Sequence, residues 1–204
     1  MTASLFLIQL INGLQLGVLL FMLSAGLTLV FGIMNFVNLA HGCLYMMGAY
    51  FAATTYAHTD SFLAAGLAAM VGAGAVGWLI EKVIAQHLYS RDHLDQVLAT
   101  FGLILFFNEA ARWIWGASPY YMNVPPALTG TIDLLGVMYP TYRFSIIVMG
   151  LLAALGCYVL ISKTRVGMLI RAGSVNPTMV AALGVNIRLL NALIFSLGGA
   201  LAGL

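Results

Sequence analysis

Polar side chains gather at one break between two apolar stretches near the start of the chain. Asn35, Asn38 and His41 recur there every three residues, and the first charged residue is Asp60. Amide and imidazole groups are costly at membrane depth, so they tend to face a cavity or a partner. With backbone freed by nearby glycines, they could line a path for a polar solute. Hydrogen bonding to one another and to a kinked backbone is the equal alternative. A metal site at His41 is not expected, because no ligand set stands at suitable spacing.

A second group of residues lies in a basic loop and predicts a complete short helix. Asn176 is a good N-cap, Pro177 suits the first helical position, residues 178–183 continue the helix, and Gly184 suits the position after it. A helix of this length is unstable alone in water. It must therefore dock on the membrane domain or on a partner protein, unless it is a plain amphipathic connector.

One pair of opposite charges stands near the end of a predicted span. Glu109 and Arg112 are three residues apart, so on a helix their side chains share a face. We expect a structural ion pair near the outer interface, and a role at an outer gate is the alternative.

Motifs of catalysis are missing from the sequence. It has no GxxxxGKS/T phosphate loop, no GxSxG elbow and no HExxH pair. No two carboxylates share an apolar run either. The chain is therefore not expected to be an enzyme or to bind ATP itself.

The composition explains why these polar positions stand out. Charged residues make up 7% of the chain and apolar types 62%, with a mean hydropathy of +1.02. A soluble domain carries about 25% charged residues. The net charge of +2 is too small to bind nucleic acid. Long apolar runs rather than alternating ones indicate an all-α, polytopic transmembrane helical bundle in the lipid bilayer.

The apolar runs predict about six spans in a single transmembrane domain over residues 1–204. They are Leu5–Gly32, Leu44–Ala57, Ser61–Ile80, Gln96–Trp115, Ser145–Ile161 and Leu189–Leu204. The second run could instead be a re-entrant segment, which would move the N-terminus to the other side. The last run is short, so we expect a truncated span in an incomplete chain. Ala65, Ala69, Ala73 and Gly77 repeat every four residues, which predicts close approach of another helix.

Basic residues set the expected orientation. Six of the eight fall in the loops 81–95 and 163–188, so these loops are assigned to the cytoplasm. We read 81–95 as a short polar loop. The opposite loop, 116–143, is rich in proline and tyrosine and predicts an ordered interfacial belt, with docking of an external protein as the alternative.

Several motifs in order along the chain carry a family resemblance. They are LSAGLTLVFGIMNFVNLAHG at 23–42, YMMGAY at 45–50, LATFGL at 98–103 and TRVGM at 164–168. The chain resembles the permeases of branched-chain amino acid ABC transporters, of the LivH/LivM type. Two departures bear on substrate. Cys43 stands where many such permeases have an acidic residue, and permeases for urea and short-chain amides share much of the motif.

The resemblance implies a multi-pass subunit of a bacterial inner-membrane importer for branched-chain or other hydrophobic amino acids. Its implied partners are a homologous second permease, two ABC ATPase subunits that hold ATP and Mg, and a periplasmic substrate-binding protein. No cofactor is implied in this chain. An ion-coupled carrier or channel is the less favoured alternative, because it would need an ionisable residue in mid-span.

The resemblance also suggests which residues serve transport. The expected substrate path comprises Asn35, Asn38, His41, Gly42, Tyr45 and Met46. The expected ATPase-coupling residues, within the loop 163–188, are Arg171, Ala172, Asn176, Pro177, Ala181 and Gly184.

Overall fold

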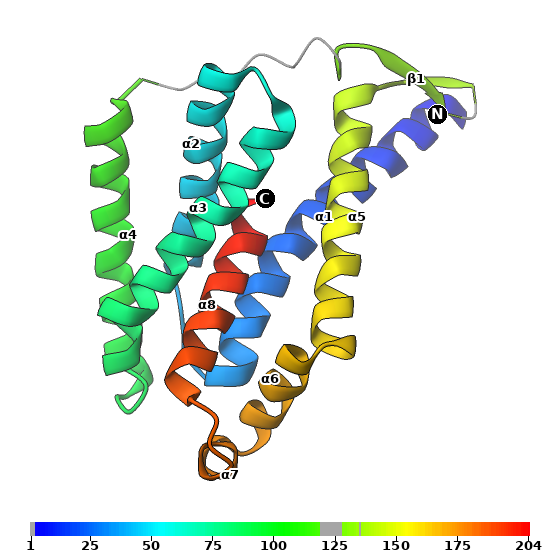
Figure 1. Ribbon diagram of the computed structural model, residues 1–204. Coiled ribbons are helices and arrows are strands. Elements are labelled where there is room, and N and C mark those ends of the chain that lie inside the picture. The colour runs from blue at the N-terminus through cyan, green and yellow to red at the C-terminus, as the bar shows by residue number, and fades with distance from the viewer. Residues whose placement is uncertain (1–2, 119–127, 135) are drawn as a thin grey trace.

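The computed structural model describes residues 3–118, 128–134 and 136–204, and they form a helical bundle (Figure 1). The elements in chain order are α1 Ala3–Met34, α2 His41–Thr59, α3 Phe62–Val83, the 3-10 helix η1 Ala85–His87, α4 His93–Trp115, β1 Thr131–Leu134, β2 Val137–Pro140, α5 Thr141–Lys163, α6 Arg165–Val175, α7 Pro177–Ala182 and α8 Ile187–Gly203. The predicted all-α bundle is confirmed, with one small antiparallel hairpin, β1–β2, added to it.

Four segments are long and apolar enough to cross a membrane: Ser4–Met34, Phe62–His87, His93–Trp115 and Thr141–Lys163. Helices α2 and α8 are not among these four segments. Helix α2 has 19 residues and α8 has 17. The chain is therefore a multi-pass membrane protein. Helix α2 runs back from the end of α1 toward the end where α3 begins (Figure 1).

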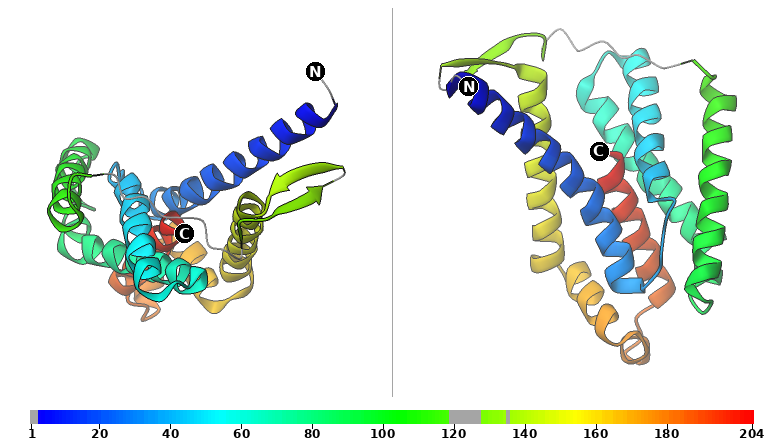
Figure 2. Two further views of the ribbon diagram at one scale, coloured as in Figure 1. Left: turned by 90° about the horizontal axis from the view of Figure 1, so that it is seen from above. Right: turned by 180° about the vertical axis from the view of Figure 1, so that it is seen from behind.

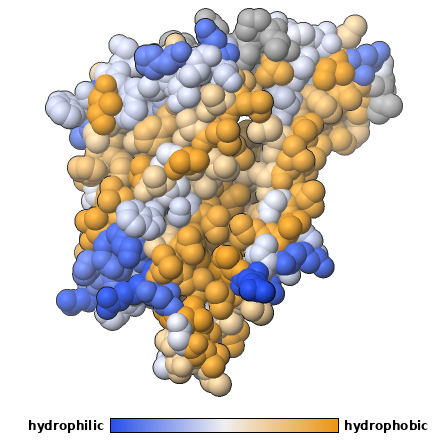
Figure 3. Space-filling model, in the orientation of Figure 1, coloured by the Kyte–Doolittle hydropathy of each residue, from blue (hydrophilic) through white to orange (hydrophobic). Residues whose placement is uncertain are grey.

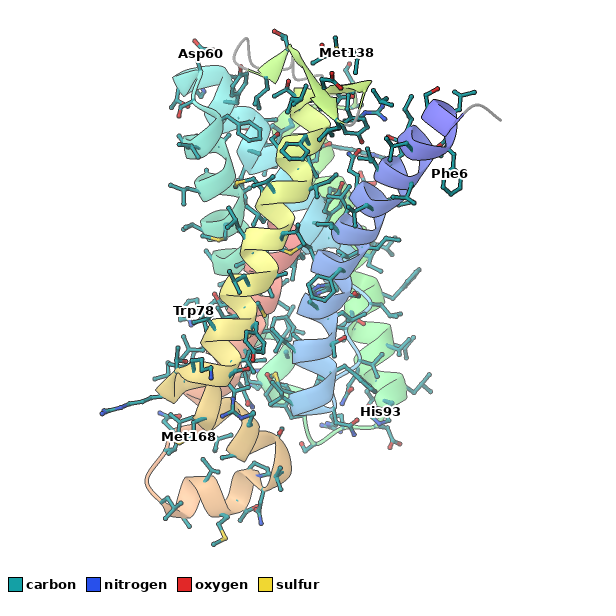
Figure 4. The ribbon with its side chains drawn as sticks, turned by 90° about the vertical axis from the view of Figure 1, so that its right-hand side faces the viewer. Phe6, Asp60, Trp78, His93, Met138 and Met168 are labelled. Carbon is teal, nitrogen blue, oxygen red and sulfur yellow. The ribbon has the colours of Figure 1, made fainter. Side chains whose placement is uncertain are left out.

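The bundle has two chemically distinct ends. Phe6, Asp60 and Met138 lie at one end, and His93 and Met168 at the other (Figure 4). We call these the hairpin end and the basic end, because the second holds the loops 84–92 and 163–188. Hydrophilic residues collect at both ends, and apolar residues cover the band between them (Figure 3). The two basic loops thus share one side, as the charge count predicts.

Helix α8 lies at the centre of the bundle and packs against α1, α2 and α3 (Figure 2). Its glycines meet the small residues of α3. A Cβ added to Gly199 would lie 2.7 Å from the Ala73 carbonyl oxygen, and one added to Gly77 would lie 2.8 Å from that of Phe195. Ala65, Ala69 and Ala73 are buried. The small-residue ladder of α3 therefore permits the close helix approach that its spacing predicts.

The structure corrects three expectations about connections. Glu81 is not in a loop: it is buried in the last turn of α3, and the loop begins at Ile84. The segment 165–175 forms a separate helix, α6, that the sequence analysis did not predict. The outer loop contains the β1–β2 hairpin, while its residues 119–127, including Pro119, Tyr120, Tyr121, Pro125 and Pro126, lie outside the described residues.

Candidate functional site

Helix α1 ends at the predicted break, and the chain continues as a short non-helical stretch, residues 35–40, before α2 begins. We call this stretch the break segment. Asn35 donates its backbone N–H to Phe31 O at 2.9 Å and then turns the chain with φ of +49°. Asparagine tolerates this left-handed conformation better than most residues. In Figure 2 the segment is the thin blue connection that runs beside α4 toward α2.

Two side chains of α4 bind the backbone of the break segment. The Val37 N–H donates to Gln96 Oε1 at 3.0 Å, and the Leu39 N–H donates to the Thr100 hydroxyl at 3.3 Å. The Thr100 hydroxyl in turn donates to the Gln96 carbonyl at 2.8 Å. Non-helical backbone inside a membrane needs such partners, since neither water nor a helix satisfies it.

Gln96 also contacts the loop at the basic end. Its Nε2 donates to Leu88 O at 3.2 Å and to Arg91 O at 3.3 Å. In the same loop the Tyr89 ring stands edge-on to Phe36, with centroids 5.7 Å apart. The Tyr89 hydroxyl donates to Glu81 Oε1 at 3.1 Å. Burial and the neighbouring Glu81 carboxyl raise the pKa of Tyr89, so its phenol stays a proton donor.

Asn38 and His41 are buried, with 3% and 4% of their surface exposed. His41 Nε2 lies 3.2 Å from Leu23 O on α1. A carbonyl oxygen can only accept, so Nε2 carries the proton and, in the neutral ring, Nδ1 is a free acceptor. Gly26 makes room for this contact, because a Cβ there would stand 2.9 Å from His41 Nε2.

Three buried polar atoms of this pair have no hydrogen-bond partner among the described residues: Asn38 Nδ2, Asn38 Oδ1 and His41 Nδ1. The alternative that these side chains hydrogen-bond one another and the backbone holds only for His41 Nε2, which contacts Leu23 O, and not for the Asn38 amide or His41 Nδ1 among the described residues. Such unpaired buried groups are uncommon in stable structures, and each one calls for an explanation. They would gain partners from a solute or from a second conformation.

These residues border an open cavity of about 620 Å³ between α1 and the start of α2. Asn38, His41 and Gly42 form one wall, and the α1 wall includes Leu20, Leu23 and Ser24. The cavity lining contains no acidic or basic side chain besides the His41 imidazole. The site therefore joins neutral polar groups to an apolar wall.

The other predicted path residues lie nearby but not in this cavity. Tyr45 borders a neighbouring cavity of about 350 Å³ between α1, α2, α3, α5 and α8. Asn35 is exposed at the end of α1, and Met46 is half-buried on α2. The structure thus brings together Asn38, His41 and Gly42 out of the six residues proposed from sequence.

The predicted short helix is present as α7, which begins at Pro177, as predicted, and ends at Ala182, one residue before the predicted end at Leu183. Asn176 Oδ1 accepts the Met179 N–H at 2.9 Å, as an N-cap does. Gly184 has a φ of +88°, the left-handed conformation expected after a helix. Val180 is buried and anchors α7 on the bundle.

The remaining predicted coupling residues are exposed around this helix. Arg171 and Ala172 lie on α6, where the Arg171 guanidinium donates to Ile161 O. Ala181 is exposed on α7. Three apolar residues at the tip are also exposed: Val175 by 85%, Met179 by 63% and Leu183 by 77%. Helix α7, which carries Met179, forms the most protruding part of the basic end (Figure 1).

The charged pair on α4 stands apart from the cavity. Arg112 Nη1 and Glu109 Oε1 are 3.0 Å apart, and both side chains are largely exposed. An exposed pair of this kind contributes little to stability. Among the described residues, no group of three or more His, Cys, Asp or Glu side chains could hold a metal ion.

The chain was compared with known proteins. A family model described as "Branched-chain amino acid transport system / permease component" matches residues 9–204. The permease protein BraD of a high-affinity branched-chain amino acid transport system in Pseudomonas aeruginosa is 31% identical over 97% of this chain and 68% of its own length. The corresponding LivH of Escherichia coli K12 is 30% identical with the same coverage.

A more distant relative extends the comparison. A probable branched-chain amino acid transport permease protein LivH of Methanocaldococcus jannaschii is 28% identical over 91% of this chain and 60% of its own length. No solved structure matches the chain. The family model covers nearly the whole sequence, including the break segment and the short helix α7. The chain therefore belongs to the permease-component family of branched-chain amino acid transport systems.

Proposed function

We propose that this chain, a permease subunit of an ABC importer, translocates branched-chain or other hydrophobic amino acids. The observation that carries the proposal is the cavity at the break segment. Asn38 and His41 line it, and their three unpaired polar atoms are buried in this conformation. A movement of the break segment that exposed these atoms would let them hydrogen-bond the polar end of a solute. The leucines opposite them suit an apolar side chain. The names of the relatives support the same substrate class.

The family implies that the subunit works within an ABC transporter complex. We infer a homologous second permease, two ATPase subunits that bind ATP and Mg, and a periplasmic substrate-binding protein, all at a bacterial inner membrane. The basic end would face the cytoplasm, since basic residues favour that side.

Helix α7 and its neighbours are the proposed contact with an ATPase subunit. The exposed apolar tip of Val175, Met179 and Leu183 needs a covering partner in water. Arg171, Ala172, Asn176, Pro177, Ala181 and Gly184 lie in or beside that tip. Movement of the ATPase would reach the bundle through the buried Val180 and the cap at Asn176.

Reconstitution tests the function directly. The permease pair is placed in vesicles with and without the ATPase subunits, and uptake of labelled leucine from the binding protein is measured. We expect uptake only by vesicles that contain the ATPase subunits and are supplied with ATP. Uptake driven by an ion gradient without ATPase would contradict the proposal. Competition by urea or acetamide instead of leucine would reassign the substrate.

A paired substitution tests the cavity. Asn38→Ala removes the unpaired amide, and we expect uptake per complex to fall about tenfold, as for loss of a hydrogen bond to a polar solute. Asn108→Ala is the control, since among the described residues that exposed amide donates to Ile104 O of its own helix alone, at 2.9 Å. Equal uptake by the two variants would argue against a path at Asn38.

A further inference from the structure

The backbone N–H groups of the break segment are bound by side chains on one face of a helix, and not by a neighbouring strand. Gln96 and Thr100 stand one turn apart on α4, about 6 Å along the helix axis. The N–H groups of Val37 and Leu39 stand two residues apart in the break segment. Each finds its own side-chain oxygen on α4.

The polar residues on the buried face of α4 are the ones that contact the break segment. Its buried residues are Gln96, Thr100, Leu103 and Ala111, and the two polar ones are those that bind the break segment. Large apolar residues on its other faces are exposed, among them Leu98, Phe101 and Phe106. Buried polar side chains on an otherwise apolar span are costly unless they bind something, and here each one does.

Gln96 uses both ends of its amide. The oxygen binds the break segment, and the nitrogen binds the carbonyls of Leu88 and Arg91 in the basic-end loop. An amide NH₂ has two protons, so both contacts can form together. The ring contact of Tyr89 with Phe36 joins the same loop to the same segment. A shift of the loop 84–92 would therefore pull on the break segment at two points.

We propose that Gln96 and Thr100 are positioning residues for translocation. They hold the break segment so that Asn38 and His41 border the cavity, and Gln96 transmits movement of the basic-end loop to that segment. Neither residue needs to touch the solute. The inference rests on the proposed path through Asn38 and His41, and it adds a second transmission route, distinct from α7.

The test uses the complete transporter, with its ATPases and binding protein, in vesicles. Four variants are compared with the parent: Thr100→Val, Thr100→Ser, Gln96→Met and the control Asn108→Leu. Thr100→Val preserves the volume of the side chain but removes the acceptor for Leu39 N–H, and Thr100→Ser keeps the hydroxyl. Leucine uptake and ATP hydrolysis are both measured per assembled complex, together with the KM for the loaded binding protein.

Loss of positioning should lower the rate of leucine uptake much more than the rate of ATP hydrolysis. We expect Thr100→Val and Gln96→Met to lower maximal uptake about tenfold while ATP hydrolysis stays within about twofold, since two or three hydrogen bonds are lost without loss of the bundle. The KM for the binding protein should not change, and Thr100→Ser should restore coupling. If Thr100→Val does not assemble, Thr100→Ala and Gln96→Met carry the comparison.

Other outcomes overturn the inference. Equal falls in uptake and hydrolysis, or a fall only in the amount of complex, would assign these residues to the scaffold alone. Normal parent uptake that the variants leave unchanged would refute the inference and leave the proposed function standing. Absence of ATP-driven uptake in the parent would refute the proposed function, and this inference with it.

Discussion

At the scale of single residues, Gly26 is where α1 touches both His41 and the central helix. A Cβ at this position would lie 2.5 Å from the Gly198 carbonyl oxygen and 2.9 Å from His41 Nε2. The approach is equally close from the other helix, since a Cβ added to Gly198 would lie 2.9 Å from the Gly26 carbonyl oxygen. Any side chain at Gly26 must therefore separate α1 from α8 or displace the His41 ring.

Gly26→Ala should consequently lower stability. We expect the purified complex to lose about 6 °C in Tm, which corresponds to roughly 2 kcal/mol of overpacking in a domain of this size. Gly13→Ala is the matched control on the same helix, because a Cβ there meets nothing within 4 Å. Thermal unfolding in detergent measures both. A Tm equal for the two variants would show that α1 and α8 do not meet at Gly26.

The residue scale also shows what a sequence can and cannot reveal. Asn38 and His41 were predictable, because polar groups between apolar runs are conspicuous. Gln96 and Thr100 were not, although they hold the same segment. They bind residues 59 and 61 positions away in the chain, and nothing local marks that pairing. Their only sign was two polar residues one turn apart at the start of an apolar span.

At the scale of elements, the stop of α7 depends on backbone conformation rather than on packing. Gly184 has a φ of +88°, and an added Cβ would meet nothing within 4 Å. Lack of space therefore does not explain the glycine here. The left-handed conformation favours glycine, since β-branched residues adopt it poorly while asparagine tolerates it.

Gly184→Val and Gly184→Asn separate these two causes. We expect the Val variant to lose at least about 1 kcal/mol of local stability, which should lower ATP-driven uptake severalfold by loosening α7. The Asn variant should transport nearly as well as the parent. Uptake per complex in vesicles is the measurement. Full coupling in the Val variant would weaken the assignment of α7 to ATPase contact.

Elements also differ in how well the sequence predicts them. The span-forming helices follow from long apolar runs, and the helix α7 from its capping residues. Helix α6 escaped prediction because its start lies at Thr164, whose hydroxyl accepts the Gly167 N–H at 3.1 Å directly after α5 ends. A single residue there ends one helix and begins the next. The β1–β2 hairpin was not predicted, because the prolines and tyrosines of the segment 116–143 suggested an ordered interfacial belt without strands.

At the scale of the whole molecule, the placement of charge specifies an orientation that can be checked. In a chain whose native Cys43 and Cys157 are replaced by alanine, single cysteines are placed at Asp60 and at Met168, which lie exposed at opposite ends. A membrane-impermeant maleimide should label Asp60→Cys in intact cells. It should label Met168→Cys only after the membrane is opened. The reverse pattern would place the basic end outside.

The three unpaired polar atoms at Asn38 and His41 have a consequence for laboratory evolution. A buried amide without partners destabilises a resting protein, and an apolar residue of similar size removes that burden, worth about 1–3 kcal/mol. Selection for heat resistance alone should therefore enrich Asn38→Leu, with a higher Tm and greatly reduced uptake. Selection for growth on leucine should restore Asn38. The residue at position 38 would thus indicate whether selection for stability or selection for transport shaped a given natural sequence.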